Sequence, residues 1–257
     1  MAISTDILTS YKKIDEAYID SLLEKEIEKN HKKIVVLDDD PTGVQTVHDI
    51  SVYTGWDKDS IRQGFEEENS LFYVLTNSRG FTEEQTIKAH HEISAVTDEA
   101  AKATGKEYIY ISRSDSTLRG HYPLETELLK ADYEKYTGKT VDGEILCPFF
   151  KEGGRFTINN VHYVKYGDTL VPANETEFAK DKTFGYTAAD LPSYVEEKTK
   201  GAYKKEDVTC ISLEDIHDMA VDRIEEQLLA VKDFNKIIVN AVDYADIKVF
   251  CVALYRA

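Results

Sequence analysis

The amino-acid sequence predicts an α/β fold in which a mostly parallel sheet is flanked by helices, with a β-rich and loop-containing insertion around residues 150–189. Short runs of apolar, often β-branched residues alternate along the chain with longer amphipathic stretches, the patterns typical of buried strands and of surface helices. Such alternation indicates βαβ units, whose strands run parallel. At 257 residues and 42% hydrophobic content, the chain is large enough for one α/β domain or for two small ones.

The first half of the chain shows the alternation most clearly. An amphipathic segment with apolar residues from Ile14 to Ile27 predicts a helix before the first strand. Gly105 and Pro123 mark the end of one later helix and the start of another. The expected helices are 15–31, 57–68, 82–104 and 123–136, and the expected strands are 34–37, 50–54, 70–75 and 107–112.

The second half begins less regularly. A strand at 144–149 is followed by a β-rich stretch at 160–164, and residues 165–189 then show few periodic features. A loop of this length in a compact domain is usually functional. Alternation then returns, with helices expected from 190, at 213–231 and at 243–255, and strands at 208–211 and 236–240.

The pattern also suggests how the chain is divided. We expect residues 1–32 to form a helical extension packed on a domain made by residues 33–257. The last predicted helix reaches Tyr255-Arg-Ala257 without a Gly, Asn or Pro stop signal. This suggests a chain cut inside or just after a helix, although natural chains also end abruptly.

The composition excludes several classes of partner. The net charge of −17 argues against nucleic acid or an anionic membrane, because both attract basic patches. No apolar stretch approaches the roughly 20 residues that cross a bilayer, and the N-terminus lacks the features of a signal peptide. Cys147, Cys210 and Cys251 are odd in number and far apart, so we expect buried, reduced thiols in a cytoplasmic protein. The oligomeric state is left open, a homo-oligomer included.

Polar residues follow three of the predicted strands. The aspartates at 38–40 come directly after the apolar run 34–37, the next buried strand ends in the turn 76–80, and the third ends in the turn 112–120. Because the carboxyl ends of parallel strands lie at one edge of a sheet, we expect these turns to converge. A solvated acidic turn is the alternative account of an Asp run, but a buried strand that delivers the run favours a functional site.

Three arginines, Arg79, Arg113 and Arg119, lie in these turns. Arginine presents a planar fork of donors that suits bidentate binding of a carboxylate or phosphate. Beside hydroxyl-rich turns, such arginines suit a small polyhydroxylated acid. Surface ion pairing is the alternative for any single one, but three on one rim favour a binding site.

The sequence contains no nucleotide-binding motif. Gly138-Lys139-Thr140 imitates the end of a phosphate-binding loop, but the glycine that the motif requires at position 133 is Tyr133. A helix end is therefore the better interpretation of these residues. There is no GxGxxG, and His90-His91-Glu92 lacks the HExxH spacing, so no metal site is predicted.

One alternative function comes from the aspartates themselves. Asp38-x-Asp40-x-Thr42 after a hydrophobic strand resembles the nucleophile loop of haloacid-dehalogenase-like phosphatases. In that interpretation Asp38 is the nucleophile, Asp40 the general acid and Mg²⁺ is bound. The class also needs a later Lys and an acidic pair, for which Gly167-Asp168-Thr-Leu-Val171 supplies only one acid.

Longer motifs resemble the four-carbon acid sugar kinase family. They are ordered and mutually spaced, and the resemblance covers the chain from about residue 33 onward. The matching segments are 36–48, 76–79, 112–120, 148–157 and 171–185. The resemblance implies ATP-dependent phosphorylation of the 4-hydroxyl of threonate, erythronate or 3-oxo-tetronate. It also implies that this chain binds the sugar acid, whereas a separate C-terminal domain, in cis or in trans, binds most of the ATP with its Mg²⁺.

The resemblance also implies roles for individual residues. It places the substrate against Asp39, Arg79 and the turn 113–116, with Asp39 or Asp115 as the catalytic base. Arg79 and Arg113 are the expected carboxylate clamps, although family members commonly have Lys where Arg113 stands. The full set of expected substrate-binding residues is Asp38, Asp39, Arg79, Arg113, Ser114, Asp115, Ser116, Arg119 and Arg155.

Arg155 and the loop 175–181 are expected to close over the site or to support a domain interface. Without the nucleotide-binding domain, the chain is expected to be inactive as a kinase. A free-standing sugar-acid-binding module is the remaining alternative.

Overall fold

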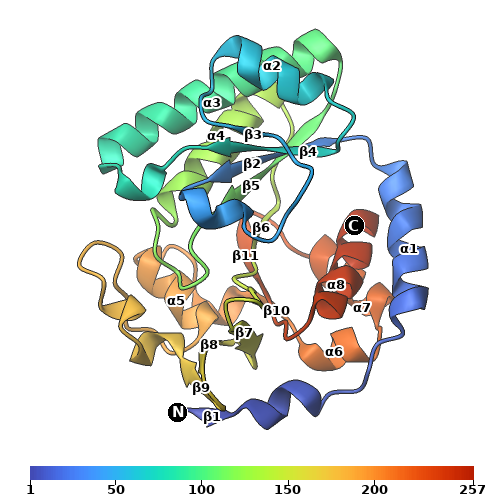
Figure 1. Ribbon diagram of the computed structural model, residues 1–257, viewed down its shortest axis with the longest axis vertical. Coiled ribbons are helices and arrows are strands. Elements are labelled where there is room, and N and C mark those ends of the chain that lie inside the picture. Colours follow the sequence, from blue (N-terminus) through green and yellow to red (C-terminus); the bar gives the residue numbers. More distant parts are fainter. The chain divides into compact units, whose positions relative to one another are not determined.

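The computed structural model describes residues 1–257, which form two compact units (Figure 1). Unit 1 comprises Met1–Asn30, Ser116–Leu118 and Asp142–Ala257, and unit 2 comprises His31–Asp115 and Arg119–Val141. Each unit has a parallel sheet of its own, so the predicted α/β class is confirmed, with the parallel strands distributed over two sheets. The predicted division into an extension and one domain stays a prediction.

Unit 2 is built on a four-stranded sheet in the order β3-β4-β2-β5, in which all neighbours are parallel. Val35, Val36 and Leu37 of β2 are buried, since this strand has a neighbour on either side. The strands are β2 (Lys33–Asp38), β3 (Val52–Tyr53), β4 (Leu71–Leu75) and β5 (Tyr108–Arg113).

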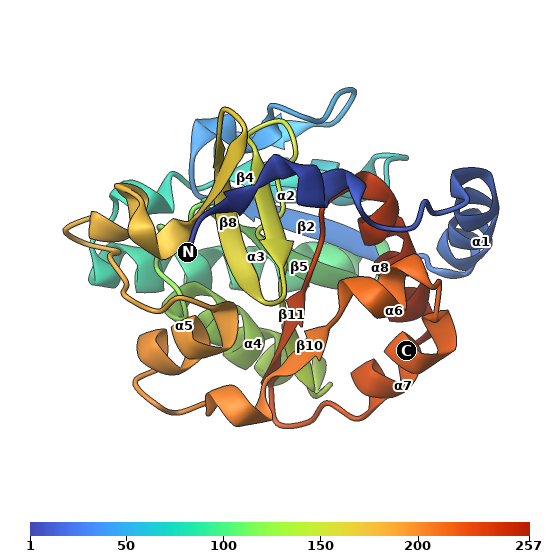
Figure 2. The same ribbon diagram turned by 90° about the horizontal axis from the view of Figure 1, so that it is seen from below.

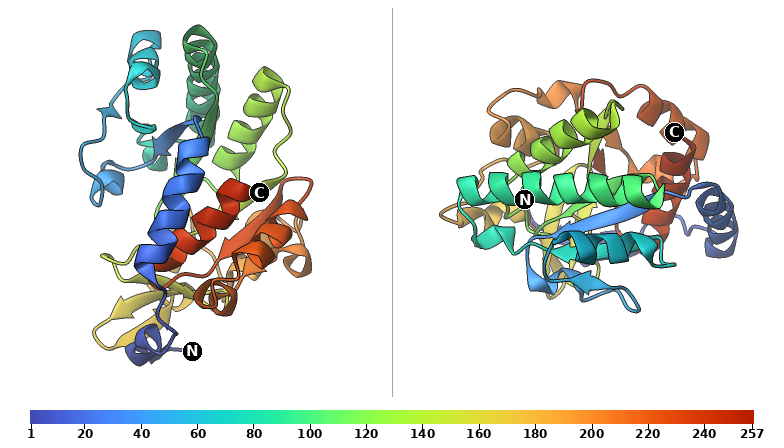
Figure 3. Two further views of the ribbon diagram at one scale, coloured as in Figure 1. Left: turned by 90° about the vertical axis from the view of Figure 1, so that its right-hand side faces the viewer. Right: turned by 90° about the horizontal axis from the view of Figure 1, so that it is seen from above.

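Three helices cover one face of this sheet (Figure 1; Figure 3, right). They are α2 (Lys58–Glu66), α3 (Glu83–Thr104) and α4 (Leu124–Thr137). The crossovers β3–α2–β4 and β4–α3–β5 run in the same direction across the sheet, so their right-handedness puts both helices on one side. Val35 and Phe72 of the sheet pack there against Phe65 of α2 and Ala101 of α3.

The ends of these helices follow from local sequence signals. Thr82 and Gln85 form a capping box at the start of α3, and Gly105 ends that helix with a φ of 66°. Gly138 ends α4 in the same way with a φ of 71°, and the Lys139 ammonium lies 2.5 Å from the Glu107 carboxylate. The interpretation of residues 138–140 as a helix end is therefore confirmed.

Unit 1 contains two sheets (Figure 2). The parallel sheet has the order β10-β11-β6, with strands β10 (Thr209–Ile211), β11 (Asn235–Val239) and β6 (Gly143–Leu146). The antiparallel sheet has the order β1-β9-β8-β7, with strands β1 (Ile3–Ser4), β9 (Thr169–Pro172), β8 (Val161–Tyr166) and β7 (Arg155–Ile158).

The main apolar cluster of unit 1 joins the N-terminal helix to the C-terminal one, and α1 lies along α8 (Figure 3, left). Ile19 of α1 and Val249 of α8 are fully buried in this cluster. The helices are α1 (Glu16–Lys29), α5 (Leu191–Lys198), α6 (Leu213–His217), α7 (Val221–Leu229) and α8 (Tyr244–Arg256).

Two expectations about secondary structure are wrong. Residues 165–189 are not a featureless loop, because β8 and β9 form a hairpin around Gly167, whose φ is 56°. The Gly167-Asp168 pair is a hairpin signal of the Gly-Asp type. The single helix expected at 213–231 is two helices, because Met219 has a φ of 54° and interrupts the helical backbone.

The cysteines and the helices bear on two further expectations. All three cysteines are free. Cys147 is exposed and the other two residues are half-buried, so complete burial of the residues is not found, whereas burial does raise the pKa of each thiol. None of the helices has both the length and the apolar character of a membrane span.

Candidate functional site

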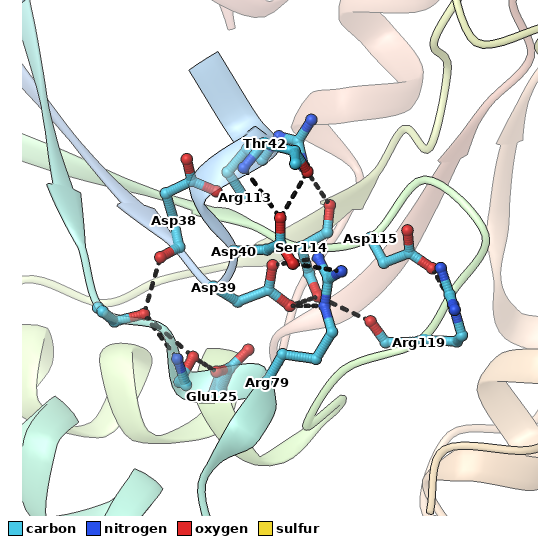
Figure 4. A network of polar contacts seen from close by, with 12 residues as sticks. Asp38, Asp39, Asp40, Thr42, Arg79, Arg113, Ser114, Asp115, Arg119 and Glu125 are labelled. Atoms are coloured by element: carbon cyan, nitrogen blue, oxygen red, sulfur yellow. Dashed lines mark hydrogen bonds and ion pairs between the residues drawn. The ribbon is translucent and has the colours of Figure 1, made fainter. Parts of the chain in front are cut away.

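The three polar turns meet, through their residues in unit 2, at the carboxyl end of the sheet of that unit, as expected (Figure 4). Asp38 ends β2 and lies in register with Leu75 of β4 and Arg113 of β5. Backbone hydrogen bonds then join the turns: the N–H of Thr76 donates to the Asp38 carbonyl at 2.8 Å, and the N–H of Asp39 donates to the Arg113 carbonyl at 3.2 Å. The turns that follow β2, β4 and β5 are therefore one connected structure.

The centre of this structure is an ion-pair network of Asp39, Arg79 and Asp40 (Figure 4). Arg79 donates to both oxygens of Asp39, from Nη2 to Oδ1 at 2.6 Å and from Nε to Oδ2 at 3.2 Å. Its other terminal nitrogen, Nη1, donates to Oδ2 of Asp40 at 3.0 Å. The Asp39 side chain is only 3% exposed, and a buried carboxylate needs such pairing to be tolerated.

Asp40 also holds the turn that follows it. Its Oδ1 accepts hydrogen bonds from the N–H of Thr42 at 2.9 Å and from the Thr42 hydroxyl at 2.5 Å. These bonds, above all the one from the hydroxyl, lower the pKa of Asp40. Both oxygens of Asp40 are thus engaged inside the protein.

Ser114 connects the third turn to Asp39. Its hydroxyl donates to Oδ2 of Asp39 at 2.7 Å. Gly120 lies directly against this hydroxyl, and a Cβ at position 120 would collide with it. The glycine is needed here for close approach, since Asp39 already receives three hydrogen bonds in the space around it.

The other two arginines of the site differ in their hydrogen-bond partners. Arg119 donates from Nε to Oδ2 of Asp115 at 2.7 Å, and this pair is mostly buried. Arg113 donates only from Nη1, to the carbonyl of Ser114 at 3.2 Å. A guanidinium has five N–H groups, so Arg113 keeps most of its donors for another partner.

Asp38 is the least satisfied carboxylate of the run. The residue is 1% exposed, and its Oδ1 has no hydrogen-bond donor. Its carboxylate rests on Gly43, where a Cβ would collide with both oxygens. Burial raises the pKa of Asp38 to about 6, against the opposing effects of the Arg113 charge and the backbone N–H of Asp40.

A buried polar network lies behind the second turn, and no pattern in the sequence points to it. The Ser78 hydroxyl donates to Oε1 of Glu125 at 2.6 Å and lies 3.1 Å from the Thr76 hydroxyl. Nε2 of His90 is 3.8 Å from the same Glu125 oxygen, and burial lowers the pKa of His90. Glu125 reads in the sequence as an ordinary acid in the first turn of a helix, so no local signal points to this role.

Two expected substrate-binding residues, Ser116 and Arg155, belong to unit 1. The Ser116 carbonyl lies 2.7 Å from Nε2 of His162. Arg155 begins β7, and its guanidinium lies 5.5 Å from the centre of the Phe178 ring. The part of these residues in ligand binding stays a prediction.

A family model described as "Sugar-binding N-terminal domain" matches residues 34–257. The chain belongs to this family. The match covers almost the whole chain, and it confirms the relationship to the four-carbon acid sugar kinases that the motifs indicated. No match is found among curated proteins.

Two solved structures with a similar fold are described as DUF1537 proteins. The chain matches a Haemophilus influenzae protein of the DUF1537 family with a TM-score of 0.58 and 15% identity, over 86% of this chain and 55% of that one. It matches a DUF1537 domain from Bordetella bronchiseptica, a domain-swapped dimer with bound citrate, with a TM-score of 0.54 and 18% identity, over 88% of this chain and 56% of that one. At such identities the likeness establishes the fold, and the sugar-binding domain spans just over half of either relative.

The phosphatase alternative gains nothing from the geometry. It needs Asp40 as a general acid, but Asp40 accepts hydrogen bonds at both oxygens and has a lowered pKa. Asp168, the later acid of that motif, lies in the hairpin between β8 and β9 of unit 1. No group of three or more His, Cys, Asp or Glu side chains is arranged to hold a metal ion.

Proposed function

We propose that the chain is the sugar-acid-binding part of an ATP-dependent kinase that phosphorylates the 4-hydroxyl of a four-carbon acid such as threonate, erythronate or 3-oxo-tetronate. The observation that carries this proposal is Arg113, a guanidinium with uncommitted donors at a sheet edge lined with carboxylates and hydroxyls. Such an arrangement offers a donor fork for the ligand carboxylate and acceptors for its hydroxyl groups.

The hydrogen bonds that each arginine already makes favour a different role for each of the three. Arg113 receives the ligand carboxylate. Arg79 already binds two carboxylates through Nε, Nη1 and Nη2, which favours a role in shaping the turn over the direct clamp expected from the sequence. Arg119 is paired with Asp115 and contributes positive charge to the rim.

The ligand bound to one relative is consistent with a hydroxy acid as substrate. The Bordetella bronchiseptica relative holds citrate, which is a hydroxylated carboxylic acid. A four-carbon sugar acid combines the same two functional groups on a smaller skeleton. This supports a hydroxy acid as the ligand class here.

ATP is expected to bind elsewhere. Asp38, Asp39, Asp40 and Asp115 outnumber the three arginines of this site, and a triphosphate requires an excess of positive charge or of N–H donors. The residues here therefore do not fit the triphosphate. A nucleotide-binding domain, in cis or in trans, would bind ATP with its Mg²⁺, and Asp39 or Asp115 remain the bases proposed from the family resemblance.

Isothermal titration calorimetry with threonate, erythronate and 3-oxo-tetronate tests this proposal. We expect at least one of them to bind, and Arg113→Gln to weaken that binding tenfold or more, since a bond between charged groups contributes about 1.5–3 kcal/mol. Arg62→Gln is the matched control, because Arg62 forms an exposed pair with Glu66 on α2. The absence of binding by all four-carbon acids would refute the proposal. A chain that phosphorylates one of them at ordinary rates without a second domain would refute the division of labour.

A further inference from the structure

We propose that Asp38 is the hydroxyl-binding group of the site, with its Oδ1 accepting a hydrogen bond from a hydroxyl of the bound acid whose carboxylate is held by Arg113. This inference rests on the proposed function and deepens it. It assigns the ligand's two functional groups to two residues that end neighbouring strands.

The three carboxylates of the turn differ in how many hydrogen bonds they already accept. Asp39 receives three hydrogen bonds from Arg79 and Ser114, and Asp40 receives three from Thr42 and Arg79. Their capacity to bind a ligand hydroxyl is therefore largely used. Oδ1 of Asp38 has no donor although it is buried, and a buried acceptor left without a donor costs stability.

Asp38 and Arg113 are also close to each other in the sheet. Asp38 and Arg113 are register partners on adjacent parallel strands, so their side chains leave the sheet on the same face. Gly43 lies against the Asp38 carboxylate, and the two carboxylate oxygens occupy the space that a side chain at position 43 would take. A small acid held by the guanidinium of Arg113 would lie on the same face of the sheet as the Asp38 carboxylate (Figure 4).

The ionisation of Asp38 depends on the charged groups around it. The ionisable groups that face Asp38 are Arg113 on β5, Tyr73 on β4, and Asp39 and Asp40 in its own turn. A donated hydroxyl stabilises the ionised carboxylate, whereas a ligand anion on Arg113 removes a cation that favours it. The hydroxyl and the carboxylate of the ligand thus act on Asp38 in opposite directions, and a test must separate them.

Comparing a hydroxylated acid with its deoxy analogue makes this separation. Threonate and butanoate have the same length, and their affinities are compared after correction for the fraction of butanoic acid that is protonated near pH 5. The effect of the anion then cancels in the ratio of their affinities. With a pKa of about 6, Asp38 goes from mostly protonated at pH 5 to mostly ionised at pH 7. The preference for threonate over butanoate should therefore rise by up to about tenfold over this range.

The affinity of threonate is measured by calorimetry at pH 5, 6 and 7. The affinity of butanoate is measured at the same pH values from its competition with threonate. In Asp38→Asn, which keeps an acceptor but cannot titrate, we expect the preference to become independent of pH. In Asp38→Ala, which removes the acceptor, we expect the preference to fall at least tenfold at pH 7. Asp59→Asn on α2 is the matched control, because the Asp59 side chain is exposed and takes no part in the hydrogen bonds of the turns, and it should behave as the unmodified chain.

The outcomes separate the two proposals. If no four-carbon acid binds the unmodified chain, the proposed function fails, and this inference fails with it. If threonate binds but its preference over butanoate has the same pH dependence in Asp38→Asn, Asp38 is not the hydroxyl-binding group, although the proposed function stands. If Asp38→Asn does not fold, the unmodified chain still decides, since a preference that is flat from pH 5 to 7 overturns the inference.

Discussion

Replacing Asp38 with asparagine is expected to raise the free energy of unfolding at neutral pH. Burial raises the pKa of this carboxyl from 3.8 to about 6 in the folded protein. The carboxyl therefore favours the folded state fully below pH 3.8, and this contribution is lost as the pH rises through 6. The folded and unfolded pKa values differ by roughly two units, each of which corresponds to about 1.36 kcal/mol. The ionised carboxyl therefore lowers the free energy of unfolding by about 3 kcal/mol at pH 7. Asparagine removes that cost but leaves its own amide to be satisfied, so about 3 kcal/mol is the upper limit of the gain.

Urea denaturation followed by tryptophan fluorescence measures this effect. Trp56 is the single tryptophan of the chain and packs against the core of unit 2, so its emission reports the unit that contains Asp38. The difference between Asp38→Asn and the unmodified chain should be largest at pH 7 and should vanish below pH 4. Asp59→Asn should show no such trend. A stability difference that is constant from pH 4 to pH 7, or a less stable Asp38→Asn at pH 7, would refute the electrostatic reasoning.

Two further substitutions test the network around Asp39. Arg79→Lys should lower the free energy of unfolding by about 2 kcal/mol, because lysine cannot reproduce the two parallel bonds to a carboxylate that is buried; Arg62→Lys, in an exposed pair, should change it by less than about 0.5 kcal/mol in the same urea titrations. Gly120→Ala should cost about 1–3 kcal/mol because the new Cβ collides with the Ser114 hydroxyl, whereas Gly80→Ala, with open space around the new methyl, should unfold at nearly the urea concentration of the unmodified chain.

The strand and the turn at residues 34–43 could be predicted because they depend on local pattern. A run of apolar residues that ends in three aspartates and Pro41 allows few structures, and the parallel arrangement then brings the later turns to the same edge. The hairpin at Gly167 and the break at Met219 were missed for a different reason. The hairpin is a local pairing of β8 with β9, but its only turn signal, Gly167-Asp168, comes before a second strand of just four residues. The break depends on Met219, a left-handed residue that carries no glycine signal.

The roles of the three aspartates could not be predicted, because they depend on which donors reach each carboxylate. In the sequence Asp38, Asp39 and Asp40 are equivalent. In the structure Asp39 is paired with Arg79 and Ser114, Asp40 caps the turn at Thr42, and Asp38 remains short of a donor. Arginine roles have the same origin: Arg79 was expected to clamp the ligand but is held by two aspartates.

This pairing also suggests how the proposed site, at an acidic sheet edge, would accept an anion. Asp39 and Asp40 share the charge of Arg79, and Asp115 is paired with Arg119. That leaves Arg113 facing Asp38, whose own ionisation Arg113 favours. An acid that binds to Arg113 weakens this support and would by itself push Asp38 toward its neutral form, which reduces repulsion between the two carboxyl groups. In the proposed complex, a hydroxyl from the same ligand reverses that tendency, so a hydroxylated acid would bind Arg113 and leave Asp38 ionised.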